Sequence, residues 1–143
     1  MFVMLRINSF LISSSVSYEN NGNSIQLNAP LAIVSPPVKG TYSFIVSLSV
    51  LGLDFYTQHN MQCVLTSPNG EKIFETKKSG IPVIEKDKTN NVLPEDFMGF
   101  LINIDLRNVF FNQSGLYEFD VFIDEKKLNT QYVPVWISNE EGK

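Results

Sequence analysis

The chain has 143 residues, a net charge of −4 and a sequence pI of about 4.9. Apolar residues make up 43% of it, which is enough for one folded domain over residues 1–143 and argues against global disorder. The acidic balance, with no basic run longer than two residues, argues against direct nucleic-acid binding, and no stretch has the ~18 apolar residues of a membrane helix.

The N-terminal part of the chain is expected to form a first strand and a hairpin. Residues 2–12 are largely apolar, but Arg6 and several polar residues interrupt them and no basic residue precedes them, unlike in a signal peptide. Residues 16–18 and 24–27 flank the sequence NNGN at residues 20–23, which is a strong hairpin-turn signal. We therefore predict an extended segment followed by two paired strands.

The middle of the chain alternates apolar and polar residues, as half-buried strands do. Residues 42–50 form the longest regular alternation, and residues 98–106 repeat the pattern. Residues 62–66 and 72–76 flank the sequence SPNG at residues 67–70, in which proline and Asn-Gly favour a tight turn. These segments predict antiparallel strands joined by short connections.

The C-terminal part contains the clearest hairpin. In residues 117–123, Tyr, Phe, Val and Ile occupy every second position, and mostly charged residues occupy the others. Gly115 permits a turn before this strand, residues 124–127 form a polar reversal after it, and residues 133–137 make a last strand. One face of the hairpin is therefore expected to lie on a core and the other in water.

Eight or nine short strands without helical periodicity predict an all-β fold. We expect a two-sheet antiparallel sandwich of the immunoglobulin-like Greek-key type, with a closed barrel as the alternative. Short helical turns are expected at residues 54–59 or 106–111.

Three segments carry a resemblance to a known group of proteins. Residues 65–73 (LTSPNGEKI), 105–110 (DLRNVF) and 115–121 (GLYEFDV) follow one another as they do in small bacterial β-sandwich proteins classed as a domain of unknown function, and the serine-rich residues 13–17 fit the same layout. The resemblance covers most of the chain and implies the sandwich fold. It implies no catalytic or binding residue, because that group has no established activity.

A long segment, residues 77–96, separates two predicted strands. It exceeds the ~12–15 residues usual for a loop, and its prolines suit a loop or an edge strand. We expect it to be a rim excursion anchored by some of Ile81, Val83, Ile84, Val92 and Leu93. Its candidate partner-binding residues are Lys77, Lys78, Glu85, Lys86, Asp87 and Lys88.

The sequence contains no recognisable catalytic or metal-binding constellation. His59 is the only histidine and Cys63 the only cysteine, and on a strand they would lie ~13 Å apart, too far for a dyad. We interpret Cys63 as a buried apolar residue and His59 as an ordinary polar residue in a connection, and one His with one Cys cannot bind zinc.

Acidic residues are interpreted as a solvated charged face rather than a calcium site. The carboxylates considered for calcium are Asp120, Asp124 and Glu125, or Asp87 with Glu85, and those considered for glycoside chemistry are Asp54 and Glu95. No calcium loop, phosphate loop or dinucleotide motif is present, so we expect no cofactor and no metal.

Aromatic residues offer a further kind of site. The candidates for a sugar-stacking platform are Trp136, Tyr132, Tyr56, Phe55 and Tyr18. Trp136 alternates with Val135 and Ile137, which favours exposure, yet a position in the core is our first interpretation.

These features favour a non-enzymatic protein that binds another protein. The expected setting is the cytoplasm of a bacterium, as a bacterial, prophage or phage accessory protein, including an inhibitor of a host defence protein. Edge strands would also allow association with a second copy. The alternatives are a carbohydrate-binding module and an enzyme with a scattered site.

Overall fold

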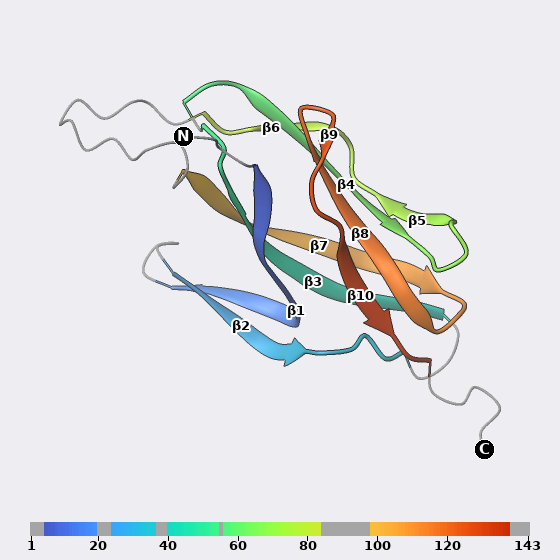
Figure 1. Ribbon diagram of the computed structural model, residues 1–143. Coiled ribbons are helices and arrows are strands. Elements are labelled where there is room, and N and C mark those ends of the chain that lie inside the picture. The colour runs from blue at the N-terminus through green and yellow to red at the C-terminus, as the bar shows by residue number, and fades with distance from the viewer. Residues whose placement is uncertain (1–4, 20–23, 37–39, 55, 84–97, 138–143) are drawn as a thin grey trace, which may run out of the picture.

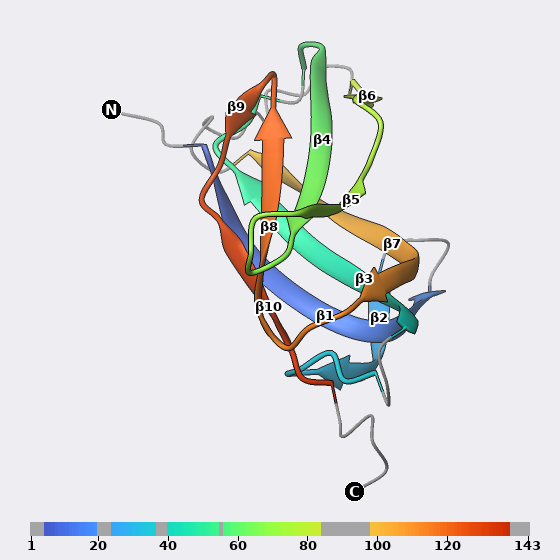
Figure 2. The same ribbon diagram turned by 90° about the vertical axis from the view of Figure 1, so that its right-hand side faces the viewer.

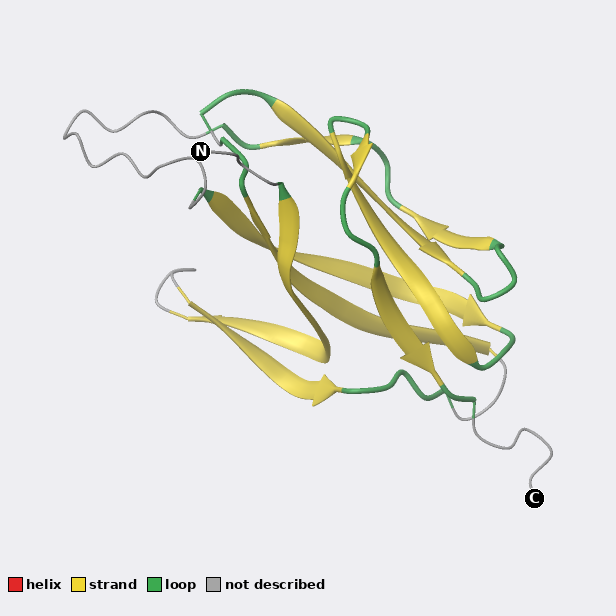
Figure 3. Ribbon diagram, in the orientation of Figure 1, coloured by secondary structure: helices red, strands yellow, loops and turns green. Residues whose placement is uncertain are grey.

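The computed structural model describes residues 5–19, 24–36, 40–54, 56–83 and 98–137. This part of the chain contains strands, turns and no helix (Figure 3). Its strands form two antiparallel sheets that pack face to face, so the predicted sandwich is confirmed and the closed barrel is wrong (Figure 1). Ten strands are present in the described ranges, against the eight or nine expected.

The first sheet has four strands in the order β2-β1-β3-β7. Their bounds are β1 Arg6–Glu19, β2 Ser24–Leu31, β3 Gly40–Leu51 and β7 Gly99–Phe111. The second sheet has the order β10-β8-β4-β5, with β6 paired to β4 and β9 paired to β8. Their bounds are β4 His59–Thr66, β5 Lys72–Glu75, β6 Ser79–Ile81, β8 Gly115–Ile123, β9 Lys126–Lys127 and β10 Gln131–Val135.

The connections between the sheets follow the immunoglobulin-like Greek key. The chain crosses from one sheet to the other between β3 and β4 and again between β7 and β8, while β3 pairs with β7 and β4 pairs with β8. The orders β1-β3-β7 and β10-β8-β4 correspond to two facing sets of strands in that fold. Figure 2 shows β8 of one sheet crossing in front of β1 and β3 of the other.

The core lies between the sheets because alternate residues of each strand point inward. Tyr117, Phe119, Val121 and Ile123 are at most 1% exposed, as the alternation in β8 predicts. From the facing sheet come further fully buried side chains, among them Phe44, Val46, Leu48, Val50, Leu106 and Phe111.

The N-terminal strand is longer than expected. Instead of separate short segments, β1 is continuous over fourteen residues and pairs with β3 through its first half and with β2 through its second. A bulge between Ile7 and Ser9 shifts the register with β3. The hairpin of β1 and β2 is as predicted, and its tip at residues 20–23 lies outside the described residues.

The helical turns expected at residues 106–111 and 54–59 are not found. Residues 106–111 belong to β7, where Asn108 adopts a positive φ of 53° and its backbone N–H donates to Ser43 Oγ. This bulge explains why the alternation breaks at that point. In the other segment, Asp54 Oδ1 accepts the backbone N–H of Tyr56, which makes a turn ahead of β4.

Two predicted turns are confirmed. In SPNG, the N–H of Gly70 donates to the carbonyl of Ser67 at 2.9 Å, and Gly70 has a φ of 90°. Between β8 and β9, Asp124 and Glu125 both have positive φ, which is the geometry of a tight two-residue hairpin.

Candidate functional site

The outer face of β10 displays two aromatic side chains. Because strand side chains alternate, Tyr132, Pro134 and Trp136 share the face that points away from the core. Tyr132 is 52% exposed and Trp136 is 63% exposed. The residues that alternate with them point inward and are buried, namely Val133, Val135 and Ile137.

Two neighbouring segments extend this face into one apolar surface. Leu116 lies opposite Pro134 in the ladder of β8 and β10 and is 57% exposed. Ile33, in the connection after β2, is 48% exposed and lines the same shallow pocket of about 450 Å³ as Leu116 and Trp136. We call Ile33, Leu116, Tyr132, Pro134 and Trp136 the Trp136 patch.

The Trp136 patch gathers much of the exposed apolar surface that the described residues present. Of the eight large apolar side chains that are exposed among the described residues, four belong to it. Contiguous exposed apolar surface of this kind usually marks an interaction site, whereas single exposed residues do not. The first interpretation of Trp136 as a core residue is therefore wrong: Trp136 follows β10 directly and continues its alternation on the outer face of the sheet, which carries no further layer.

The backbone beneath the patch is held by hydrogen bonds. The N–H of Val34 donates to the carbonyl of Pro134 at 2.9 Å, and the N–H of Trp136 donates to the carbonyl of Val34 at 3.0 Å. Ser35 Oγ donates to the carbonyl of Trp136, and Ser114 Oγ accepts the N–H of Ile137. The hydroxyl groups of Ser35 and Ser114 thus help to fix the chain around Trp136.

Tyr56 is the one other aromatic candidate whose side chain is described, and it lies outside the Trp136 patch. Tyr56 is half-buried in the turn before β4. Phe55 and the side chain of Tyr18 lie outside the described residues.

Only some of the candidate partner-binding and anchoring residues in residues 77–96 lie within the described part of the chain. Lys77 and Lys78 are exposed, and Lys78 Nζ lies 2.8 Å from Glu125 Oε2, which lowers the pKa of Glu125. Ile81 is buried and Val83 exposed. Candidates beyond them lie outside the described residues, namely Ile84, Glu85, Lys86, Asp87, Lys88, Val92 and Leu93.

The sequence suggested that His59 is an ordinary polar residue in a connection, and this interpretation is wrong. It begins β4, its Nδ1 lies 2.6 Å from Asp124 Oδ2, and its Nε2 lies 2.6 Å from the carbonyl of Asp54. Burial lowers the pKa of His59, but the hydrogen bonds to Asp124 and to the Asp54 carbonyl outweigh it and raise the pKa above its usual value. Both ring nitrogens are therefore engaged with oxygen atoms, so neither is free to act as a base.

Cys63 lies farther along β4 and is fully buried, as predicted. Burial raises the pKa of its thiol to about 12. The strand keeps Cys63 away from the His59 ring, and the local helix that a dyad would need is absent from these described residues.

The acidic candidates divide between buried and exposed positions. Asp120 is only 7% exposed and accepts a hydrogen bond from Thr130 Oγ1 at 2.7 Å, so the solvated face expected for it is wrong. Asp124 Oδ2 is hydrogen-bonded to the His59 ring, and Asp124 Oδ1 accepts the backbone N–H of Asn60. Within the described ranges no group of three or more His, Cys, Asp or Glu residues is placed to hold a metal. The residues Glu85, Asp87 and Glu95 fall outside those ranges.

Comparison with known proteins supports the fold. Neither protein-family models nor curated proteins match the chain, so the resemblance to small bacterial sandwich proteins stays a prediction. Among solved structures, the chain is similar to the C-terminal domain of Wzt (TM-score 0.53, 9% identity), covering 96% of this chain and 77% of that one.

A second structural similarity is to the Pseudomonas fluorescens alkylpurine DNA glycosylase AlkC bound to DNA containing an abasic site analog. The TM-score is 0.50 at 8% identity, and the match covers 93% of this chain. The chain spans about 30% of that protein's length. At these identities both similarities concern the sandwich architecture alone.

None of the described residues forms a helix with the length and hydropathy to cross a bilayer.

Proposed function

We propose that this protein is a non-enzymatic binding module whose Trp136 patch docks onto an apolar surface of a partner protein. The observation that carries the proposal is the exposure of Trp136, at 63%, beside the 57% exposed Leu116 on a sheet face. Tryptophan and tyrosine are the residues most enriched among those that dominate binding energy at protein interfaces. A surface that gathers them with aliphatic neighbours suits such an interface.

The groups that line the pocket beside Trp136 favour a protein partner over a sugar. A sugar needs hydrogen-bonding groups around the stacking ring as well as the ring itself. Here the hydroxyls of Ser35 and Ser114 are already bonded to the backbone at Trp136 and Ile137. The remaining lining is largely apolar, which matches the desolvated centre of a protein interface.

The patch is also pre-organised. Trp136 donates and accepts backbone hydrogen bonds on the side of β10 away from β8, through Val34 and Ser35. Its neighbour Val135 is buried and pairs with Gly115 in β8. A backbone held from both sides loses little freedom on binding, so less of the interaction energy is offset by ordering.

The setting expected from the sequence remains part of the proposal: a cytoplasmic accessory protein of a bacterium, prophage or phage, acting on another protein such as a defence protein of the host. The carbohydrate-binding alternative uses the same two aromatic side chains, Tyr132 and Trp136. One set of variants can therefore distinguish the two.

The experiment is affinity capture from the protein's own cells followed by quantitative identification of bound proteins. We compare wild type with Trp136→Ser and Leu116→Ser, and use Phe110→Ser, which alters a side chain of similar exposure (54%) on β7, as the matched control. The partner should be retained by wild type and Phe110→Ser and lost with the two patch variants. Melting temperatures should stay nearly equal, because exposed substitutions usually change stability by less than ~0.5 kcal/mol.

Two results would contradict the proposal. One is a partner that Trp136→Ser and Leu116→Ser retain as well as wild type does. The other is a glycan array on which wild type binds a sugar that Trp136→Ser loses, with no protein captured, which would establish the carbohydrate-binding alternative.

A further inference from the structure

The Trp136 patch has an exposed carboxylate at its border. Glu118 lies directly opposite Tyr132 in the ladder of β8 and β10, and two residues after Leu116 along β8. Side chains at these positions share the outer face of the sheet, and the Cβ atoms of directly opposite residues lie ~4.5–5.5 Å apart. Glu118 is exposed, and no lysine or arginine of the described residues forms an ion pair with it.

A second exposed carboxylate belongs to the turn beside the patch. In this turn, residues 67–71, Pro68 lies so close to Gly115 that a Cβ atom added there would come within 2.7 Å of Pro68 Cγ. Gly115 itself lines the pocket of the patch. Burial raises the pKa of the Tyr117 hydroxyl, and the negative charge of Glu71 raises it further. The exposed Glu71 therefore adds a second negative charge at this end of the sheet.

The lysines in the strands of the same sheet do not offset these two carboxylates. Lys72 is paired with Glu75 at 3.2 Å, and Lys127 lies 3.8 Å from Asp120. Lys126 belongs to the β9 hairpin, at the far end of β8 from Leu116. The nine residues of β8 span ~26 Å, which exceeds the Debye length of ~8 Å at physiological ionic strength. The apolar patch is thus bordered by negative charge that the lysines of these strands leave unpaired.

We propose, resting on the function proposed above, that the partner segment bound by the Trp136 patch carries large apolar residues flanked by lysine or arginine. Its apolar side chains would cover Trp136 and Leu116, and its basic side chains would lie over Glu118 and Glu71. Complementary charges at the rim of an interface speed association and exclude wrong partners. A segment flanked by acidic residues would meet like charges here, on a chain whose net charge is already −4.

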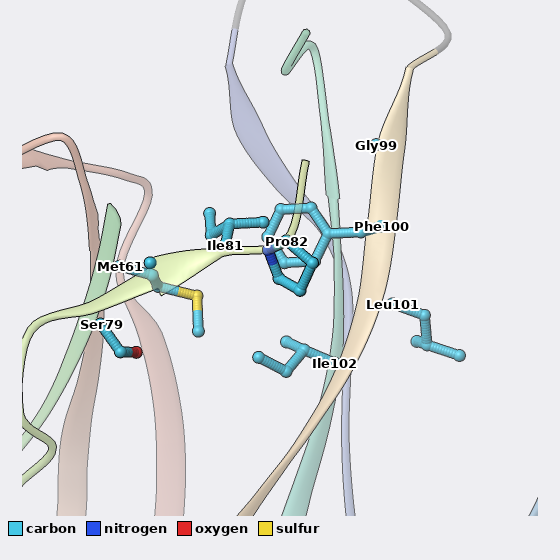
Figure 4. A pocket seen from close by; sticks show the side chains of 9 residues that line it. Met61, Ser79, Ile81, Pro82, Gly99, Phe100, Leu101 and Ile102 are labelled. Atoms are coloured by element: carbon cyan, nitrogen blue, oxygen red, sulfur yellow. The ribbon is translucent and has the colours of Figure 1, made fainter. Parts of the chain in front are cut away.

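Another apolar hollow lacks such charges. It is a cavity of about 410 Å³ between β6 and β7, where Phe100 and Ile102 face Ile81 and Pro82 (Figure 4). The described residues that line it include no charged side chain. This cavity would accept apolar groups whatever their neighbours, so a preference for basic over acidic peptides distinguishes the Trp136 patch from it.

The test uses three capped peptides that differ only in charge. Each has three central leucines, flanked on both sides by two lysines, two glutamates or two glutamines. Trp136 is the only tryptophan of the chain and the peptides contain none, so the emission of Trp136 reports occupancy of the patch directly.

The lysine peptide should shift the emission of Trp136 to shorter wavelength and bind at least tenfold more tightly than the glutamate peptide, with the glutamine peptide between them. Its advantage should shrink with added NaCl, because the Debye length falls from ~8 Å at ~0.15 M to ~3 Å at ~1 M. A peptide bound only in the cavity between β6 and β7 would leave the emission unchanged.

Three variants locate the effect on the protein. Glu118→Gln should weaken the lysine peptide about two- to fivefold, as expected for one exposed ion pair, and leave the glutamine peptide unchanged. Glu125→Gln is the matched control, because it changes the net charge equally but lies in the hairpin at the far end of β8. It should leave all three peptides unchanged. Leu116→Ser keeps the tryptophan and should weaken all three.

The outcomes separate this inference from the function proposed above. Equal affinities of the lysine and glutamine peptides, or no effect of Glu118→Gln, overturn the basic partner even where Leu116→Ser weakens binding and so supports an apolar docking surface. A glutamate peptide that binds more tightly overturns it as well. An emission of Trp136 that no peptide changes at millimolar concentration also overturns the inference, while the capture experiment still decides whether Trp136→Ser loses a partner.

Discussion

The hydroxyl of Tyr117, near the start of β8, donates a hydrogen bond to the backbone carbonyl of Gln113, 2.8 Å away across the turn that follows β7. The ring is fully buried and meets Phe111 edge-on, with centroids 5.2 Å apart. Immunoglobulin-like sandwiches use the same contact, a tyrosine corner, where the chain crosses between sheets. The hydrogen bond thus holds the connection between β7 and β8, where the chain passes from one sheet to the other, against the buried Tyr117 ring.

Removing this hydroxyl should destabilise the fold without creating a large cavity. Tyr117→Phe leaves the carbonyl of Gln113 without its partner, which should cost about 1–3 kcal/mol of unfolding free energy. Tyr132→Phe removes a hydroxyl from an exposed ring and should change little. Urea denaturation of the two variants measures the difference, and equal midpoints would show that the corner contributes nothing.

The register of β8 predicts opposite effects at adjacent positions. Phe119 is fully buried and packs on Phe10 with ring centroids 5.4 Å apart, whereas Glu118 is exposed on the outer face. Phe119→Ala should cost about 3–5 kcal/mol. Glu118→Ala should stay within ~0.5 kcal/mol of wild type. Thermal unfolding followed by circular dichroism checks both, and similar losses from both substitutions would contradict this register.

The pair of His59 and Asp124 should make stability depend on pH in a defined direction. The folded pKa of His59 is raised, so its contribution is complete below the unfolded value of ~6.5 and is lost as the pH rises through the folded pKa. The hydrogen bond from His59 lowers the folded pKa of Asp124, so that contribution is present above ~3.9 and is lost as the pH falls through the folded value.

The measurement for this pair is the melting temperature of wild type and His59→Gln across the pH range. The difference between them should be largest between pH ~4 and ~6.5 and should shrink as the pH rises above the folded pKa of His59. Asp124→Asn should reduce the difference in the same window, because the imidazolium then lacks its carboxylate. A difference that is constant from acidic to alkaline pH would mean that the pair is only a packing contact.

Cys63 should be unreactive in the folded protein. Its side chain is fully buried, and burial raises the pKa of the thiol to about 12, so the reactive thiolate is scarce at neutral pH. A thiol reagent such as DTNB should label Cys63 only at the rate at which the protein unfolds, and urea should accelerate labelling in step with the unfolding transition. Rapid labelling without denaturant would contradict the buried position.

The local pattern of the chain was sufficient to predict the sandwich and the inner face of its strands. In β8 the alternation correctly assigned Tyr117, Phe119, Val121 and Ile123 to the core, because a strand reverses its side chains at each residue whatever its surroundings. The same rule predicts that Trp136 is exposed, because it alternates with Val135 and Ile137. The interpretation of Trp136 as a core residue relied on its residue type instead, and it was wrong because no further layer covers the outer face of this sheet.

Contacts between distant segments were beyond the reach of the sequence. His59 and Asp124 are 65 residues apart and meet only because β4 pairs with β8. The buried carboxylate of Asp120 finds its hydrogen-bond donor, Thr130, beyond the β9 hairpin. The cavity between β6 and β7 likewise depends on two strands of different sheets. Alternation determines which way a side chain points along its own strand, but strand order and the packing of the sheets decide which groups from the rest of the chain lie beside it.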